Sequence, residues 1–285
     1  MSISASQVKE LREMSGVGMM ECKKALVETD GDLDRALDLL RANSSLKAEK
    51  KASRVAADGA VKVAETSSYV SLVEINSETD FAAKDAQFKE FTSSVADHLV
   101  NGRVDSIELL NQALDGQRQT LIQSIGENIQ LRRLSTLEIP KGGSIGSYIH
   151  SDGRLAALVS LNVDNKELAK DLAMHVSATS PSCLNSDDID PVLLERERAI
   201  YLAQAEDSGK DQAIMEKMVD GKVKRFLSEV TLVSQAFVKN PDQSIQQLID
   251  ENNASIIEFV RFKVGEGIEV EVKDFAAEVA EQLKQ

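Results

Sequence analysis

Four carboxylates lie close together in one stretch of the sequence and could supply acid–base chemistry. They are Glu74, Glu78, Asp80 and Asp85. General acid–base catalysis needs partner groups within hydrogen-bond reach of the reacting atoms. No histidine, cysteine or lysine stands beside these carboxylates in a recognisable catalytic arrangement. Solvated surface carboxylates are the simpler interpretation, and an acid–base enzyme using Glu78 or Asp80 is kept as an alternative hypothesis.

The cysteines and histidines are too scattered to predict a metal site or a nucleophilic centre. Cys22 and Cys183 form no CxxC or zinc pattern and are expected to be small, partly buried side chains. The three histidines form no HExxH motif. We expect His98 at the surface, His175 as a structural histidine near the core, and His150 pointing to solvent beside a hairpin turn. The sequence thus predicts a reduced, cytoplasmic protein without metal or cofactor.

Two glycine-containing stretches resemble nucleotide-binding motifs only superficially. Gly16-Val17-Gly18 lacks the preceding strand and the third glycine of a dinucleotide fingerprint, so a turn between helices explains it better. Gly221-Lys222-Val223 lacks the upstream glycine and the following serine or threonine of a phosphate loop. The chain itself is therefore expected to bind no nucleotide.

The most informative segment is the polar run 76–85, which joins a predicted strand to a predicted helix. Thr79 or Asp80 could cap that helix. Phe81 lies seven positions before Phe88, so burial in the core is one interpretation. The other is an exposed aromatic anchor for a partner, because polar residues surround Phe81 at this corner. The residue pattern leaves both interpretations open.

Charge and composition exclude several classes of protein. The 285 residues include 33 basic and 47 acidic side chains, which give a formal net charge of −14, and only 4% aromatics with no tryptophan. Nucleic-acid affinity comes mostly from clustered Lys and Arg and from aromatic stacking, so direct nucleic-acid binding is disfavoured. The longest largely apolar stretch, 155–163, is far shorter than the ~20 residues that span a bilayer. The amino terminus has no signal-peptide pattern, and no membrane association is expected.

Residues 1–54 are predicted to form a small helical module with a linker. Apolar residues recur at helical spacing in three short segments, which Gly16–Gly18 and residues 29–32 separate. The module holds ten basic and nine acidic residues, so the acidity of the chain lies elsewhere. Such a module more often binds a partner than catalyses a reaction. At its end four basic residues cluster, and a solvated helical linker face is their simplest interpretation: Lys47, Lys50, Lys51 and Arg54.

The rest of the chain predicts an α+β fold with a doubled core. Apolar alternation predicts strands, with hairpin turns at residues 66–68 and 151–153, and helical spacing predicts the helices between them. The order hairpin, helices, strand occurs twice, which indicates two similar α+β subdomains. The first is expected over 55–140, and the second over 141–189 and 231–264. In the first subdomain we expect two separate helices at 106–114 and 120–129.

A helical hairpin is predicted as an insertion at 190–230. Its two apolar seams are typical of an antiparallel coiled coil. The seams consist of Leu193, Ile200 and Ala203 on one helix and Met215, Met218, Val219, Val223 and Phe226 on the other. Residues 265–285 form the predicted C-terminal module, with a short amphipathic helix at 274–284.

Five motifs of the chain resemble those of the elongation factor Ts family. Residues 8–26 resemble the opening signature of the family, and Thr79-Asp80-Phe81-Ala82-Ala83-Lys84 resembles its second signature. Residues 125–128, 174–176 and 264–267 match three further motifs in the family's order and spacing. The resemblance runs essentially from end to end. The departures are minor: Ala82 stands where valine is common, and Ser177 replaces a small apolar residue.

The resemblance implies a guanine-nucleotide exchange factor that binds elongation factor Tu, displaces its Mg²⁺ and promotes GDP release, with no covalent chemistry of its own. It implies that the N-terminal module is similar to ubiquitin-associated domains and docks on the GTPase. Asp80 and Phe81 match the intruding pair of the family. The other positions that match family contacts are Ala82, Ala83, Lys84, Lys23, Ile125, Gly126 and His150.

Two questions stay open at the level of sequence. The helical module and the hairpin also suit an adaptor that binds the GTPase without promoting exchange. The hairpin could mediate a homodimer or a two-to-two complex with the GTPase, or pack on the body of the protein.

Overall fold

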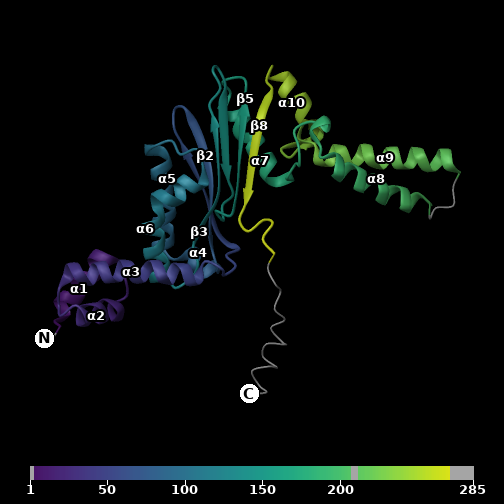
Figure 1. The fold of residues 1–285 in the computed structure, drawn as a ribbon. Helices are drawn as coiled ribbons and strands as arrows, with labels where there is room; N and C mark the ends of the chain where they lie inside the picture. Colours follow the sequence, from purple (N-terminus) through teal and green to yellow (C-terminus); the bar gives the residue numbers. More distant parts are fainter. Residues whose placement is uncertain (1–2, 207–210, 270–285) are drawn as a thin grey trace. The chain divides into compact units, whose positions relative to one another are not determined.

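The computed structural model describes residues 3–206 and 211–269, and Figure 1 shows the order of their helices and strands. The helix predicted at 274–284 lies outside the described residues. Mixed helices and small sheets confirm the α+β class. Internal contacts divide the chain into two compact units. Of the described residues, unit 1 contains 3–62, 73–134 and 263–269, and unit 2 contains 63–72, 135–206 and 211–262.

Three helices form a small module at the start of unit 1. They are α1 (Ala5–Ser15), α2 (Met19–Glu28) and α3 (Leu33–Lys51). A capping box formed by Ser4 and Gln7 begins α1, and Gly16 ends it with φ +67°. The side chains buried among the three helices are Val8, Leu11, Val17, Cys22, Ala25, Leu26, Ala36 and Leu40. The turn between helices predicted at Gly16-Val17-Gly18 is therefore confirmed.

The first sheet has the strand order β1-β2-β3. All residues of β2 are buried, so buried and exposed side chains do not alternate along this strand. Three helices lie between β2 and β3 in the sequence. The sequence predicted helices in this region, but not the break that separates α4 from α5. The elements are β1 (Asp58–Glu65), β2 (Tyr69–Ser77), α4 (Asp80–Lys84), α5 (Ala86–Asn101), α6 (Ile107–Ile125) and β3 (Gln130–Glu138).

The prediction of two helices at 106–114 and 120–129 is wrong, because α6 runs without a break through this region. Gly116 lies inside the helix, and no atom comes within 4 Å of where its Cβ would be. A helix-interior glycine costs only ~1 kcal/mol relative to alanine. Burial of Leu110, Leu114 and Leu121 on one face of α6 is worth more than that cost.

Unit 2 contains a second sheet with the order β4-β5-β8. Strands β4 (Ser144–Ile149) and β5 (Leu155–Leu161) pair antiparallel across the predicted hairpin turn. Helix α7 (Lys166–Thr179) packs on both strands. Gly146 permits this packing, because a Cβ there would stand 2.1 Å from the Ala169 carbonyl carbon. Strand β8 (Ile256–Lys263) follows helix α10 (Ile245–Glu251) in the sequence.

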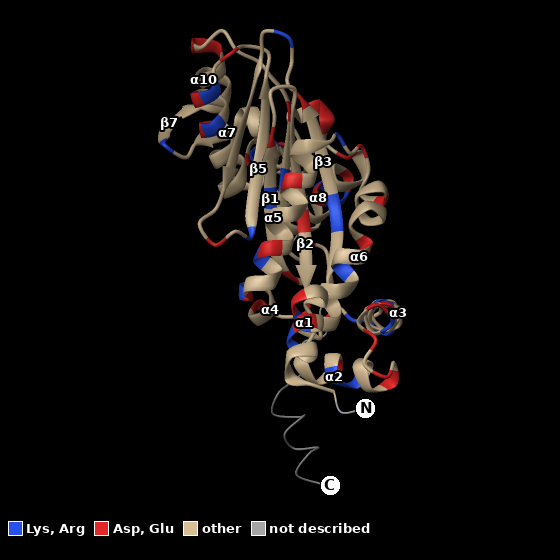
Figure 2. Ribbon diagram, turned by 90° about the vertical axis from the view of Figure 1, so that its left-hand side faces the viewer, with Lys and Arg blue, Asp and Glu red and all other residues tan. Residues whose placement is uncertain are grey.

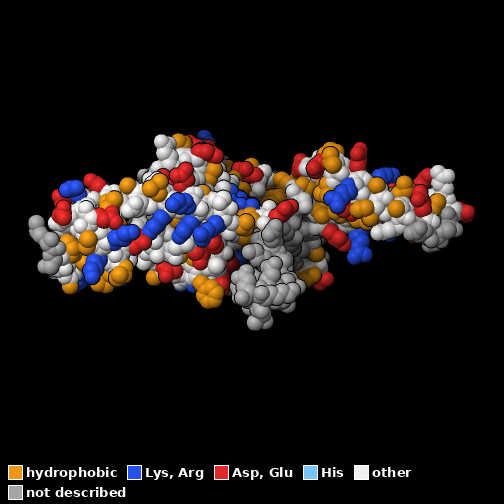
Figure 3. Space-filling view, turned by 60° about the horizontal axis from the view of Figure 1, so that its bottom comes forward, with side chains coloured by type: hydrophobic (Ala, Val, Ile, Leu, Met, Phe, Trp, Pro, Cys, Tyr) orange, Lys and Arg blue, Asp and Glu red, His pale blue; other side chains and the backbone are white. Residues whose placement is uncertain are grey.

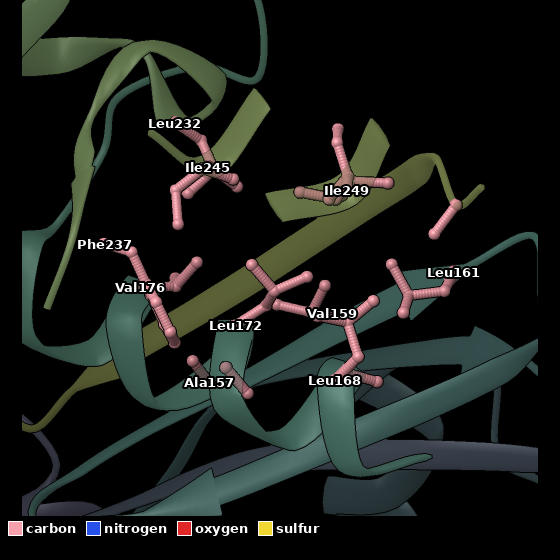
Figure 4. Close-up of a cluster of buried hydrophobic side chains, with 14 residues drawn as sticks. Ala157, Val159, Leu161, Leu168, Leu172, Val176, Leu232, Phe237, Ile245 and Ile249 are labelled. Atoms are coloured by element: carbon pink, nitrogen blue, oxygen red, sulfur yellow. The ribbon is translucent and has the colours of Figure 1, made fainter. Parts of the chain in front are cut away.

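The core of unit 2 lies between α7, β5 and α10. Figure 4 shows Leu168, Leu172 and Val176 of α7 facing side chains of β5 and α10. All are buried, and each fully buried aliphatic side chain contributes ~1.5–3 kcal/mol. This cluster fixes α7 on the sheet.

The predicted helical hairpin is present as α8 (Pro191–Glu206) and α9 (Gln212–Val230), which lie side by side in Figure 1. Its base is held by hydrogen bonds from Ser182 N–H to the Val230 carbonyl and from Leu232 N–H to the Cys183 carbonyl. Among the described residues, no helix is long and apolar enough to cross a membrane.

The seam predicted for α8 is partly wrong. Ala203 is exposed and Ile200 is 40% exposed, whereas Ala205 is buried. The apolar residues of α8 are spread around the helix, so apolar spacing alone does not identify the contacting face. Two short strands that the sequence did not predict, β6 (Ala236–Phe237) and β7 (Asn240–Ser244), follow the hairpin.

Candidate functional site

The corner between β2 and α4 presents an aromatic ring to solvent. Thr79 caps α4, because its Oγ1 accepts a hydrogen bond from the Ala82 N–H at 3.3 Å. Phe81, in the first turn of α4, is 81% exposed. Burial of Phe81 in the core is therefore excluded, and its role as an anchor for a partner stays a prediction.

A carboxylate and an ammonium group lie beside this ring in the sequence. Asp80 Oδ2 and Lys84 Nζ are 2.6 Å apart, one helical turn from each other, and both side chains reach solvent. Ala82 is buried and Ala83 is half-buried. Helix α4 thus packs its alanines inward and offers an ion pair and a ring to a partner.

A second motif comes to this corner from the end of α6. Ile125 is half-buried, and Gly126 ends the helix with φ +87°. The carboxylate of Glu127 accepts hydrogen bonds from the Thr79 backbone N–H at 2.9 Å and from its hydroxyl at 2.6 Å. These hydrogen bonds join the residue after Gly126 to the residue before segment 80–84.

The basic cluster at the end of α3 also reaches this region, so its interpretation as a solvated linker face is wrong for two of its members. Lys47 Nζ lies 2.6 Å from a carboxylate oxygen of Glu21, and Lys51 Nζ donates to the Gly126 carbonyl. Burial of the Lys51 ammonium, together with the neighbouring charge of Arg54, lowers the pKa of Lys51. The last turn of α3 is thus tied to the loop after α6.

Lys23 lies on a different surface of unit 1. It is exposed on α2 and lines one depression with Met20 and Val27. Met20 is 77% exposed and Val27 is 57% exposed, and Figure 3 shows hydrophobic and basic side chains mixed on the visible face of the three-helix module. Exposed apolar groups with a basic neighbour are typical of a docking surface.

His150 belongs to unit 2, at the turn between β4 and β5. It is exposed, as predicted, and its Nδ1 lies 3.1 Å from Asp152 Oδ1. It stays a separate candidate contact.

One of the four carboxylates grouped in the sequence, Glu74, is not available for acid–base chemistry. Glu74 is fully buried rather than solvated, and its oxygens accept from Arg132 Nη1 at 3.0 Å and from Gly265 N–H at 2.8 Å. Arg133 Nε donates to the same carboxylate. Figure 2 shows acidic residues on β2 and basic residues on the neighbouring strand β3. Because N–H groups of the protein already donate hydrogen bonds to both carboxylate oxygens of Glu74, this residue has a structural role in an ion-pair cluster and is not available to a substrate.

The remaining histidines and cysteines serve packing. His175 is buried, with Nε2 2.9 Å from Gln235 Oε1 and Nδ1 accepting from the Val238 N–H, so the structural interpretation is confirmed. Cys22 and Cys183 are free and buried. His98 is half-buried on α5 rather than fully at the surface.

Comparison with known proteins identifies the family. The family model described as "Elongation factor TS" matches residues 78–266. The chain is 50% identical to the elongation factor Ts of Hahella chejuensis, over 99% of both chains. It is 45% identical to that of Klebsiella pneumoniae, again over 99% of both. The chain belongs to the elongation factor Ts family.

The hydrogen bonds between Glu127 and Thr79 were not predicted from the sequence. Glu127 was visible only as part of the motif 125–128, with no role of its own, and Glu78 was grouped with solvated carboxylates. Glu127 and Thr79 are 48 positions apart, so no local pattern could predict their hydrogen bonds.

Proposed function

We propose that this protein is a guanine-nucleotide exchange factor that acts on elongation factor Tu during translation. The observation that carries the proposal is the 81% exposure of Phe81 on a capped corner, in the segment that matches the intruding motif of the family. A large apolar side chain held in water has a favourable free energy of transfer into a partner's cleft. Membership of the elongation factor Ts family supplies the identity of the partner.

The proposed mechanism is displacement without covalent chemistry. Phe81 enters between helices of the GTPase near its Mg²⁺ site, and the Asp80 carboxylate disturbs the water molecules bound to that ion. Mg²⁺ demands near-ideal octahedral geometry, so moving its ligands weakens the hold on GDP. By thermodynamic reciprocity, GDP weakens the binding of the exchange factor by the same factor. GTP can then enter the emptied site.

Further contacts are proposed from the other matched positions. Lys23, with Met20 and Val27, would dock the N-terminal module of residues 1–54 on the GTPase. Lys84, Ile125 and Gly126 would line the contact around Phe81, and the inward-facing Ala82 and Ala83 would support Phe81 through the packing of α4. His150 would supply a separate contact.

The proposed layout of the chain is that of the family. It consists of two similar subdomains at 55–140 and 141–264, a coiled-coil arm at 190–230 inserted in the second, and a C-terminal module at 265–285. The arm could join two copies of the factor in a homodimer or in a two-to-two complex. We expect action in the cytoplasm, with no cofactor and no direct contact to nucleic acid or membrane.

The direct test is release of a fluorescent GDP from elongation factor Tu by stopped flow. A substoichiometric amount of the protein should accelerate release, because each molecule acts repeatedly. Replacement of Asp80 by Asn should slow release and leave the fold intact, since the ion pair of Asp80 with Lys84 is exposed to solvent and the amide keeps the size of the side chain.

A non-exchanging adaptor is the second candidate function. The depression on α2 that Met20, Lys23 and Val27 line favours docking without any requirement for exchange. An adaptor would bind elongation factor Tu in a pull-down or by calorimetry and leave the GDP release rate unchanged. That outcome would replace the exchange proposal.

A further inference from the structure

We propose that Glu78 and Glu127 are positioning residues that hold the Phe81 corner in its partner-ready geometry. The inference rests on the proposed exchange function. Each carboxylate accepts hydrogen bonds from the segment that carries the other one. Glu127 accepts from the N–H and the hydroxyl of Thr79, and Glu78 Oε1 accepts from the Asn128 N–H at 2.6 Å. We call these four residues, Glu78, Thr79, Glu127 and Asn128, the carboxylate clasp.

The clasp leaves no polar atom of Thr79 free to change partners. Its N–H and hydroxyl donate to Glu127, and its carbonyl accepts from the Ser77 hydroxyl at 2.9 Å. Its Oγ1 also receives the Ala82 N–H that begins α4. Because Thr79 lies two residues before Phe81, hydrogen bonds that hold the Thr79 backbone in place also restrict the orientation of the Phe81 side chain.

The clasp is needed because α4 cannot hold this direction by itself. The helix has five residues, and an isolated helix shorter than ~12 residues is marginal in water. Its buried face offers only the small Ala82. Hydrogen bonds to ionised acceptors are roughly twice as strong as neutral ones, so two carboxylates suit the task.

The clasp is itself anchored to the three-helix module. Asn128 is fully buried and donates through Nδ2 to the Arg54 carbonyl at 2.8 Å. Arg54 Nη1 lies 3.4 Å from Glu78 Oε1, and Lys51 donates to the Gly126 carbonyl. The residues at the end of α3 and just after it thus contact both segments of the clasp, the one with Glu78 and the one with Asn128. The three-helix module and the Phe81 corner are therefore linked through the same residues.

If the clasp holds Phe81 in place before the partner binds, its loss should affect one kinetic parameter of GDP release more than the other. A mobile Phe81 would still find the GTPase, but it would have to be ordered before it could displace the ligands of the ion. Loss of the clasp should therefore lower the maximal rate of GDP release more than it raises the half-saturating concentration. Loss of a residue that only stabilises the fold would lower the free energy of unfolding without lowering the maximal rate more than it raises the half-saturating concentration.

The test uses the full chain with Glu127→Ala, Glu127→Gln and a matched control, Glu90→Ala, on the exposed face of α5. Amide hydrogen exchange of residues 79–85 should become about tenfold faster in Glu127→Ala, while exchange in residues 155–161 stays unchanged. The maximal rate of GDP release should fall about tenfold. Glu127→Gln should lie between wild type and Glu127→Ala, because its amide keeps one acceptor oxygen. Glu90→Ala should match wild type in both measurements.

A double-mutant cycle shows whether Glu127 acts through the corner. In a background where Asp80 and Phe81 are both alanine, Glu127→Ala should cause no further loss of rate. An undiminished loss in that background would overturn the positioning role, as would unchanged hydrogen exchange at 79–85 in Glu127→Ala. If the wild-type protein fails to accelerate GDP release, the proposed function and the rate effect fall together. The hydrogen-exchange comparison still decides whether the clasp holds the corner.

Discussion

Phe81 and Phe88 lie seven residues apart and have opposite environments. Phe81 is 81% exposed on α4, whereas Phe88 is 0% exposed on α5. Two identical side chains therefore offer a matched pair, one available to a partner and one committed to the core.

Replacement of Phe81 by Ala should reduce GDP release from elongation factor Tu by at least about tenfold with little loss of stability. The ring has few intramolecular contacts to lose, and surface changes of this kind usually stay within about 0.5 kcal/mol. Stopped-flow release and urea unfolding of the same preparation measure the two quantities. A full rate in a correctly folded Phe81→Ala protein would remove this residue from the mechanism.

Phe88→Ala is the matched control and should behave in the opposite way. Deleting a fully buried ring costs about 3–5 kcal/mol through lost transfer energy and the cavity left behind. The unfolding midpoint should fall clearly. Any loss of exchange activity should then follow the fraction of unfolded protein rather than a specific defect.

The seven-residue spacing of these phenylalanines shows what the sequence could and could not predict. Apolar periodicity correctly placed most helices and strands, the β4–β5 hairpin and the α8–α9 insertion, because each depends on local spacing and turn residues. It could not decide the environment of Phe81, since a spacing of seven fits one helix face equally well. A break between α4 and α5 at Asp85 rotates the two rings apart, and only the folded chain shows it.

The interactions around the site depend on contacts between distant segments. Glu74 looked like a solvated carboxylate because charged residues are rarely buried. Its burial follows from β2 being covered along its whole length, and from arginines 58 and 59 positions later in the sequence. The solvated-linker interpretation of Lys47 and Lys51 failed for the same reason, since their acceptors lie on α2 and after α6.

Glu74→Gln should destabilise the protein by about 2–4 kcal/mol, because it removes a buried carboxylate that pairs with Arg132 and with Arg133. Arg133 keeps a longer ion pair, at 3.7 Å. Both guanidinium groups are partly exposed, so water limits the cost. Thermal unfolding measures the loss, and Glu13→Gln, in an exposed pair with Lys9, is the control that should change little.

Glu74 should also contribute to acid sensitivity. Burial alone would raise its pKa, but hydrogen bonds from Gly265 N–H, Asn76 and Arg133 outweigh that effect and hold the pKa below its ordinary value of 4.5. The stabilisation is present above pH 4.5 and is lost as the pH falls through the folded-state pKa. Urea unfolding from pH 6 down to pH 3 should show a steeper loss in wild type than in Glu74→Gln; parallel curves would contradict the assignment.

His175 should lower the free energy of unfolding in a pH range above the one in which Glu74 acts. Burial lowers its pKa below 6.5 despite the hydrogen bond to Gln235. The unfolded chain therefore takes up the proton first as the pH falls below 6.5, and the folded state loses stability between that point and the folded-state pKa. Urea unfolding at about pH 7.5 and 5.5 should reveal the slope. His175→Gln should flatten it; an equal slope in the wild type and in this variant would rule His175 out.

Gly116 and Gly146 should respond in opposite directions to substitution by alanine. Gly116→Ala should stabilise the protein by about 0.5–1 kcal/mol, because α6 is continuous there and the added methyl meets no atom within 4 Å. Gly146→Ala should cost about 3 kcal/mol or more, because its Cβ would stand 2.1 Å from the backbone of α7 and would force the helix off β4. Unfolding midpoints of the two variants give the comparison. A destabilised Gly116→Ala would mean that α6 is interrupted after all, and a native-like Gly146→Ala would mean that α7 does not approach the strand this closely.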